Sequence, residues 1–131
     1  MIEDYFTEIE SMLIASPIVL SFKSSKEEIS KDRGWINGSI IFTNGTQMHL
    51  FEYVKIDDSP RIIKYKYHWQ GKDGKLIKRW DNAPHHKELE TYPDHIHVGE
   101  SVYPHKNMNL KHVLDILEEE IEKDPVSFHN V

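Results

Sequence analysis

Residues 61–70 alternate between two kinds of side chain more regularly than any other stretch of this chain. One set is apolar or aromatic and comprises Ile63, Tyr65, Tyr67 and Trp69. The other set is mainly polar and comprises Ile62, Lys64, Lys66, His68 and Gln70. A repeat of two residues is that of a β-strand, whose successive side chains point to opposite faces of a sheet. The segment therefore predicts a strand with aromatic side chains in a core and hydrogen-bond donors on the other face.

Turn signals place this strand within an antiparallel series. Asn44-Gly45 predicts a hairpin, residues 71–74 (GKDG) predict a second turn, and the DDSP run at 57–60 is a break. Strands are therefore expected over residues 18–23, 35–43, 47–56, 61–70 and 75–81. Two segments are less regular: residues 24–33 read as a loop or a strand extension, and residues 95–98 as a last short strand.

Amphipathic stripes at helical spacing lie at both ends of the chain. The first stripe consists of Ile2, Tyr5, Phe6, Ile9, Met12 and Leu13, and it predicts a helix over residues 2–15 that Ser16-Pro17 ends. The second stripe consists of Leu110, Val113, Leu114, Leu117 and Ile121, with Asn109 placed to cap the helix. The prediction is one α+β domain, residues 1–131, with about five antiparallel strands and both helices on one sheet face.

The composition excludes several kinds of site and location. The chain has no cysteine, so disulfides, thiolate catalysis and cysteine zinc sites are excluded. No apolar run approaches the roughly 18 residues of a membrane-spanning helix. The acidic N-terminus lacks the positive start of a secretory signal. We therefore expect a cytoplasmic protein without a membrane partner.

Charge is distributed unevenly along the chain. The net charge of −6 argues against a general nucleic-acid binder. Residues 61–80, however, contain seven Lys or Arg and one Asp, so this stretch carries +6 and the other 111 residues carry −12. A basic stripe on an acidic body can bind a polyanion locally while the body binds a basic partner. The alternative is a solvated hairpin edge whose lysines oppose aggregation.

Histidines are concentrated in one segment. Five of the nine histidines lie between residues 65 and 99, namely His68, His85, His86, His95 and His97. Imidazole exchanges protons near neutral pH and also binds metals. The other four, His49, His105, His112 and His129, lie outside the cluster, and we expect them to do no chemistry. The cluster predicts either an acid–base site or a metal site.

Other polar residues near the cluster suit phosphate chemistry. Arg79 can stabilise charge on a phosphate in the transition state, and Asp81 can orient a neighbouring histidine. Glu52 stands among apolar residues, where burial raises a carboxyl pKa and makes a base; the alternative is that Glu52 turns outward or pairs with Arg79. The residues expected to bind the substrate are Lys64, Lys66, Lys78 and Gln70.

A metal site is the alternative use of the same histidines. His95 and His97 are two residues apart, so on a strand both project from one face and can hold a metal together. His85 or His86 would supply a further ligand, although adjacent residues on an extended backbone point apart. The spacing is not that of a diagnostic zinc motif. We therefore favour an acid–base site without a cofactor.

Two tryptophans can be placed either in the core or on the surface. Trp69 and Trp80 lie on neighbouring predicted strands. Exposed indole rings would be stacking platforms for bases. Burial in the core is the more common outcome for such residues, and we expect it for both.

One pattern combines the strand over residues 50–54 (LFEYV) with the string of residues 80–86 (WDNAPHH). It also includes Tyr65, Tyr67, His68, Asp73, Gly74, Arg79, Pro93, His95, His97, Val98 and Gly99. By this pattern the segment from Tyr65 to Glu100 resembles the TumE family of toxins, from bacterial and archaeal type II toxin–antitoxin pairs, and the resemblance spans residues 35–120. One departure is Asp94, where the family pattern is more basic.

The resemblance implies a growth-inhibiting toxin, an endoribonuclease, with RNA as substrate and a cognate antitoxin from an adjacent gene as partner. The order of elements is similar to that of RelE-like ribonuclease toxins, which is an analogy of fold. The sequence is compatible with both a monomer and a homodimer. In the expected mechanism, Glu52, His68, His85 or His97 takes a proton from the 2′-hydroxyl and another histidine protonates the leaving oxygen. The other readings are a metal-dependent nuclease or phosphodiesterase, and a non-catalytic module that binds RNA or protein.

Overall fold

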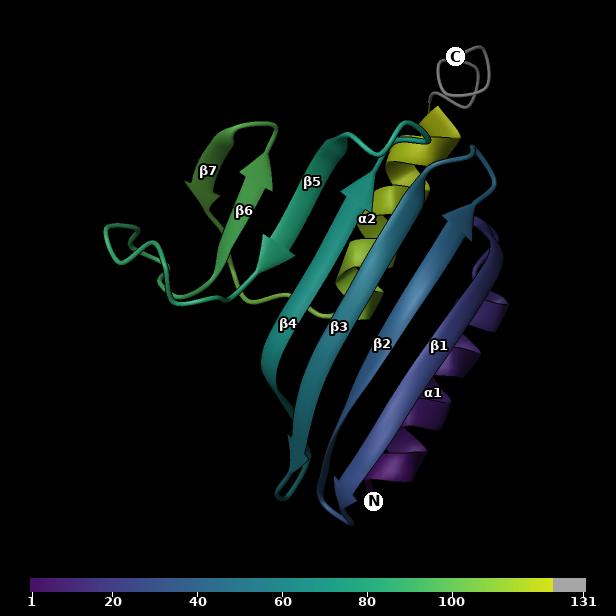
Figure 1. Cartoon of the computed structure of the whole chain (residues 1–131), viewed down its shortest axis with the longest axis vertical. Coiled ribbons are helices and arrows are strands. Elements are labelled where there is room, and N and C mark those ends of the chain that lie inside the picture. Colours follow the sequence, from purple (N-terminus) through teal and green to yellow (C-terminus); the bar gives the residue numbers. More distant parts are fainter. Residues whose placement is uncertain (124–131) are drawn as a thin grey trace.

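A computed structural model describes residues 1–123 of the chain, which form two helices and one sheet (Figure 1). The elements in chain order are α1 (Ile2–Ala15), β1 (Val19–Ser30), β2 (Arg33–Phe42), β3 (Gln47–Ile56), β4 (Pro60–Gln70), β5 (Leu76–Asp81), β6 (His95–Val98), β7 (Ser101–Pro104) and α2 (Leu110–Lys123). The predicted α+β class and the order of helix, antiparallel strands and helix are confirmed. Within this part of the chain, neither helix is long and apolar enough to cross a membrane.

The sheet has seven strands rather than about five, and they follow one another in chain order from β1 to β7. The expected short strand over residues 95–98 is present as β6. The strand missing from the prediction is β7, whose four residues are too few to show an alternation. The polar run over residues 24–33 proves to be strand extension, because backbone pairing with β2 continues to the pair Ser30–Arg33.

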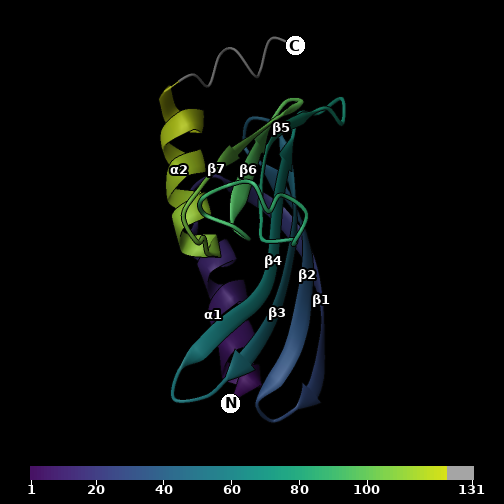
Figure 2. The ribbon, with the colours of Figure 1, turned by 90° about the vertical axis from the view of Figure 1, so that its left-hand side faces the viewer.

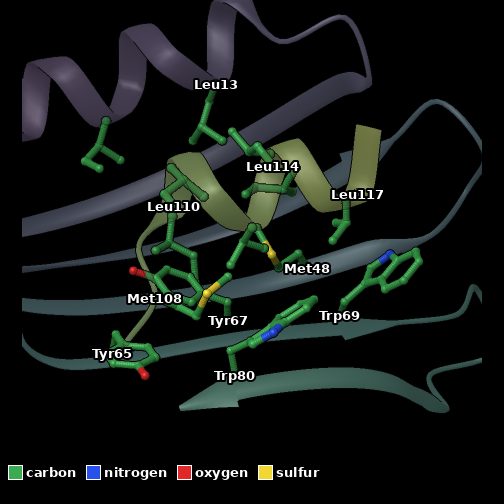
Figure 3. Close-up of a cluster of buried hydrophobic side chains, with 14 of the residues drawn as sticks. Leu13, Met48, Tyr65, Tyr67, Trp69, Trp80, Met108, Leu110, Leu114 and Leu117 are labelled. Carbon is green, nitrogen blue, oxygen red and sulfur yellow. The ribbon is translucent and has the colours of Figure 1, made fainter. Parts of the chain in front are cut away.

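Both helices cover the same face of the sheet, as the sequence predicts (Figure 2). The two helical stripes meet the aromatic side chains of β4 and β5 in one core (Figure 3). Trp69 and Trp80 are both buried there, as expected, so neither is available for stacking on a base. Asn109 caps α2, since its side-chain oxygen accepts a hydrogen bond of 2.9 Å from the backbone N–H of His112.

The opposite face of the sheet is free of helices over the described residues, and we call it the open face (Figure 2). Alternation decides which side chains reach it, because residues next to a core residue along a strand point away from the core. On β4, the buried Tyr65 and Tyr67 therefore leave Lys64, Lys66 and His68 on the open face. The polar half of the alternating segment lies on this face.

Candidate active site

Strand register aligns an unusual set of side chains across the open face. Successive partners on β1 to β6 form one line, which we call the histidine row: Lys23, Ser39, His49, His68, Arg79 and His97. The neighbouring line on β2 to β6, the Asp81 row, is Asn37, Phe51, Lys66, Asp81 and His95. Residues far apart in sequence are therefore brought together by pairing alone.

Asp81 is the centre of the polar network at the β5–β6 end. Asp81 is 5% exposed. Oδ1 lies 2.9 Å from Nε2 of His95 and accepts a 2.9 Å hydrogen bond from the backbone N–H of Ala83. Oδ2 accepts a 3.1 Å hydrogen bond from Nε of Arg79 and lies 3.5 Å from Nε2 of His97. Asp81 thus engages Arg79 and the imidazole of His95, and it lies beside the imidazole of His97.

His95 is fixed from both sides. It is 2% exposed, and Nδ1 lies 2.9 Å from the backbone oxygen of Pro93 while Nε2 faces Asp81. Both partners are oxygen acceptors, so each ring nitrogen faces an acceptor. A ring with both nitrogens engaged has a positioning role, and its contact with Asp81 keeps that carboxylate in place.

His97 has the opposite arrangement. Nη2 of Arg79 lies 3.1 Å from Nε2 of His97. A guanidinium only donates hydrogen bonds, so His97 accepts through Nε2 and its ring is neutral. Burial and the charge of Arg79 lower the pKa of His97, and Asp81 opposes this effect. The result is an imidazole with a lone pair at the edge of the open face, which is the form that a general base needs.

His68 and His49 continue the histidine row. Their ring centroids are 6.3 Å apart. Burial, then Arg79 and His49, lower the pKa of His68, while a side-chain hydrogen bond with Gln70 raises it. From the sequence, His68 is expected in the site and His49 is not. The register between β3 and β4 is what brings His49 in, because it sets His49 opposite His68.

The connection between β5 and β6 brings a third imidazole to the cluster. The ring of His86 lies 4.9 Å from that of His95 and 5.7 Å from that of His97, measured between centroids. Its Nδ1 is 3.3 Å from a carboxylate oxygen of Glu88. His85 is exposed instead. Only His86 of the pair joins the cluster, and residue 85 lies in a turn rather than on the extended backbone that the prediction assumed.

Three of the four proposed metal ligands therefore come together. One nitrogen from each of His86, His95 and His97 lies within 4.8 Å of the others. The donors suit zinc or another transition metal. Three contacts oppose a metal ion, however: Arg79 places a positive charge against Nε2 of His97, and Asp81 and Pro93 engage both nitrogens of His95. The arrangement suits an anion beside Arg79 better than a metal.

A groove of about 850 Å³ opens beside these residues on the open face. Several of the residues that line it are cationic or carry imidazole: Lys23, Lys64, Lys66, Arg79, His49, His85, His86 and His97. Asn82 lines its wall, and the Asn82 amide hydrogen-bonds the backbone of β4 at Ile63 and Tyr65, 3.0 Å each. Asn82 thus bridges the end of β5 to β4.

Two predicted site residues lie on the other face of the sheet. Glu52 is 0% exposed in the helix-covered core, where the hydroxyls of Tyr5 and Tyr67 donate to its carboxylate. Burial raises the pKa of Glu52, as the sequence predicts, but the sheet separates it from the histidines, and it does not pair with Arg79. Lys78 also points to the helices and pairs with Glu120 of α2. Neither residue reaches the groove.

Comparison with known proteins supplies the family. The family model described as "Toxin TumE" matches residues 9–124, which is most of the chain. Searches of curated proteins and of solved structures found no significant match. The likeness to RelE-like toxins therefore stays a prediction. The match includes every strand and all residues of both rows, and on this basis the chain belongs to the TumE family of toxins.

Proposed function

We propose that this chain is the toxin of a type II toxin–antitoxin pair and that it inhibits growth as a metal-independent endoribonuclease. The observation that carries the proposal is the neutral His97 held against Arg79 at the end of a cationic groove. A base, a phosphate-binding cation and further imidazoles are the groups that cleavage of RNA by its own 2′-hydroxyl requires.

The first part of the proposed step uses Arg79 and His97. A phosphate entering the groove draws the guanidinium of Arg79 toward its oxygens, as Arg is suited to do. This frees Nε2 of His97, which takes the proton of the 2′-hydroxyl while the 2′-oxygen forms a bond to phosphorus. Asp81 keeps its hydrogen bond to Nε of Arg79 and so limits how far the guanidinium moves.

The second part needs an acid. The bond from phosphorus to the 5′-oxygen breaks, and a protonated imidazole gives that oxygen its proton, which leaves a 2′,3′-cyclic phosphate and a free 5′-hydroxyl. His86 is our candidate, because its ring lies beside that of His97 on the groove wall. Lys64 and Lys66 bind flanking phosphates from β4.

Controlled expression in a bacterium tests this function. Wild type is compared with His97→Gln and with His112→Gln, which replaces an exposed histidine of α2 as a matched control. We expect growth arrest and RNA loss with wild type and the control, and neither with His97→Gln. Purified wild type should cleave RNA in the presence of a chelator. Full activity of His97→Gln would remove this residue from the mechanism.

A metal-dependent nuclease is the second candidate, and one observation favours it: the nitrogens of His86, His95 and His97 converge within 4.8 Å. This reading expects metal in the purified protein and loss of cleavage with a chelator. Restoration of cleavage by added zinc or manganese would support it further. Cleavage that resists the chelator supports the acid–base reaction instead.

The antitoxin part of the proposal follows from family membership. A partner that neutralises a toxin often lies as a peptide over its site, and the acidic helix side also offers a surface for a basic partner. Co-expression of the small open reading frame adjacent to the toxin gene should restore growth and co-purify with this chain. Growth arrest that persists with every neighbouring product would contradict the pairing.

A further inference from the structure

Three aromatic side chains lie on the open face next to the candidate site. Trp35 of β2 pairs with Tyr53 of β3, and Phe51 lies two residues along β3 from Tyr53. Each is half-buried, in contrast to Trp69 and Trp80. Phe51 belongs to the Asp81 row and lines the groove.

Alternation fixes the face on which they lie. Their neighbours along the strands are buried residues of the helix-covered core: Ile36, Leu50, Glu52 and Val54. Successive side chains of a strand point to opposite faces, so Trp35, Phe51 and Tyr53 point away from the helices. Partly exposed aromatic rings gathered on a sheet face that no helix of the described residues covers mark a binding surface.

Lysines are interleaved with these rings. Lys64 is the register partner of Tyr53, and Lys66 is that of Phe51. Both lysines are exposed. One acid, Glu27, pairs with Trp35 at the β1 end. Asp81 also lies on the open face, where it engages Arg79 and His95. Nine further acids lie on the helices: α1 carries Glu3, Asp4, Glu8 and Glu10, and α2 carries Asp115, Glu118, Glu119, Glu120 and Glu122. The open face therefore joins cations to aromatic faces, while the helix side is acidic.

We propose that Trp35, Phe51 and Tyr53 form a stacking platform for unpaired bases, so that the substrate is single-stranded RNA laid across the open face. This rests on the proposed ribonuclease function. Aromatic rings in a cationic groove are how sheet surfaces bind single strands, because every base has a face to stack. The bases of a duplex are stacked on one another and cannot lie on the rings.

Register gives the geometry of binding. The histidine row, the Asp81 row and the Trp35–Tyr53 pair are successive steps of two residues, so each step is about 7 Å along the strands. The phosphate that is cut lies at the β5–β6 end of the first two rows, and the bases beside it reach Phe51 and then Tyr53. Because β3 lies two strands from β5, about 10 Å across the sheet, the platform binds nucleotides near the cleaved bond rather than directly at it.

Binding of an intact oligonucleotide by the full chain tests the platform. The protein carries His97→Gln, so that RNA is not consumed, and the probe is a fluorescent single-stranded RNA of about ten nucleotides. Replacing Phe51 and Tyr53 with leucine should weaken binding about 5- to 100-fold. Tyr103→Leu is the matched control, because Tyr103 is an exposed aromatic residue of β7 that pairs with Ile96 outside both rows. Equal melting temperatures verify folding.

A second measurement uses the tryptophans. Trp35 is half-buried, whereas Trp69 and Trp80 are buried in the core (Figure 3). Single-stranded RNA should quench part of the tryptophan fluorescence, and Trp35→Phe should abolish that change while binding persists. A duplex of the same sequence should bind more weakly and quench little.

The outcomes separate the two proposals. Undiminished affinity of the Phe51→Leu/Tyr53→Leu variant, or a duplex that binds as tightly as the single strand, overturns the platform even if wild type cleaves RNA. Aromatic-dependent binding in a protein that cleaves no RNA supports the platform and overturns the ribonuclease.

Discussion

Glu52 and Asp81 are both buried carboxylates in the same sheet, yet they lie on opposite faces and have opposite surroundings. Glu52 accepts hydrogen bonds from two tyrosine hydroxyls, whose pKa values burial raises well above their ordinary value. Asp81 contacts an arginine and two histidines beside an open groove. Burial of a carboxylate is therefore a poor guide to function. What distinguishes the two is whether the partners exchange protons near neutral pH and whether a substrate can reach them.

Matched amide substitutions of the two carboxylates should give the largest difference in RNA cleavage. Asp81→Asn removes the charge that holds Arg79 and His95, and we expect RNA cleavage to fall about 10²- to 10⁴-fold, as for other orienting carboxylates. Glu52→Gln should leave cleavage within about twofold, because Glu52 lies outside the groove. Single-turnover cleavage of a labelled RNA measures both, with melting temperatures to confirm folding. Equal losses of cleavage in the two variants would show that both substitutions act by destabilising the fold.

The pH dependence of RNA cleavage tests the groups around Asp81, where His97 is the proposed base. The pKa of His97 is lowered, so the base stays neutral below its ordinary value of about 6.5. Activity should therefore fall only when the pH drops below that value. Arg79→Gln removes a cation that lowers this pKa, so the acid limb should move to higher pH while the maximum rate also falls. A pH–rate profile checks this, and an acid limb unmoved by Arg79→Gln would contradict His97 as the base.

The pH dependence of the free energy of unfolding tests the surroundings of Glu52. The pKa of Glu52 is raised in the folded state, so the folded protein holds this proton at pH values where the unfolded chain has lost it. Its contribution to stability is complete below the unfolded value of about 4.3 and is lost as the pH rises through the folded value. Urea unfolding across this range should show a fall that Glu52→Gln removes. An unchanged slope in the variant would mean that Glu52 is ionised in the fold.

Substitutions of two lysines, one on each face of the sheet, should have the smallest effects. Lys78 pairs with Glu120 on the helix side and is about a quarter exposed (27%), so Lys78→Ala should change stability by no more than about 1 kcal/mol and leave RNA affinity unchanged. Lys66→Ala, on the open face, should weaken RNA binding and reduce its salt dependence. A salt titration of RNA binding distinguishes them. Weaker binding by Lys78→Ala would place RNA on the helix side.

The sequence predicted the helix over residues 2–15 and the strand over residues 47–56 with the bounds that the structure has, because both have a clear hydrophobic period. The burial of Glu52 was also predicted, since its neighbours of the same parity are apolar. Its exclusion from the site was not, because a carboxylate's value as a base depends on what faces it. Lys78 was misplaced although its parity with Trp80 indicates the core side.

The composition of the histidine row could be predicted only in part. His68, Arg79 and His97 were singled out by type, but His49 joins them through the register of β3 and β4. The break at residues 57–60 has no defined hairpin length, so that register cannot be counted from the turn. The aromatic platform was not predicted, for the same reason. Phe51 and Tyr53 gain meaning only when the lysines opposite them are known.

The order of the sheet has a consequence for how such a protein is made. Because strands that are consecutive in the chain are also neighbours in the sheet, the histidine row is assembled one residue per strand in the order of synthesis. The proposed base, His97, arrives with the sixth strand. A slip of one residue in an earlier hairpin would turn the side chains beyond it to the other face. An incomplete or misregistered chain therefore lacks part of the histidine row, and under the proposed function it would not cleave RNA.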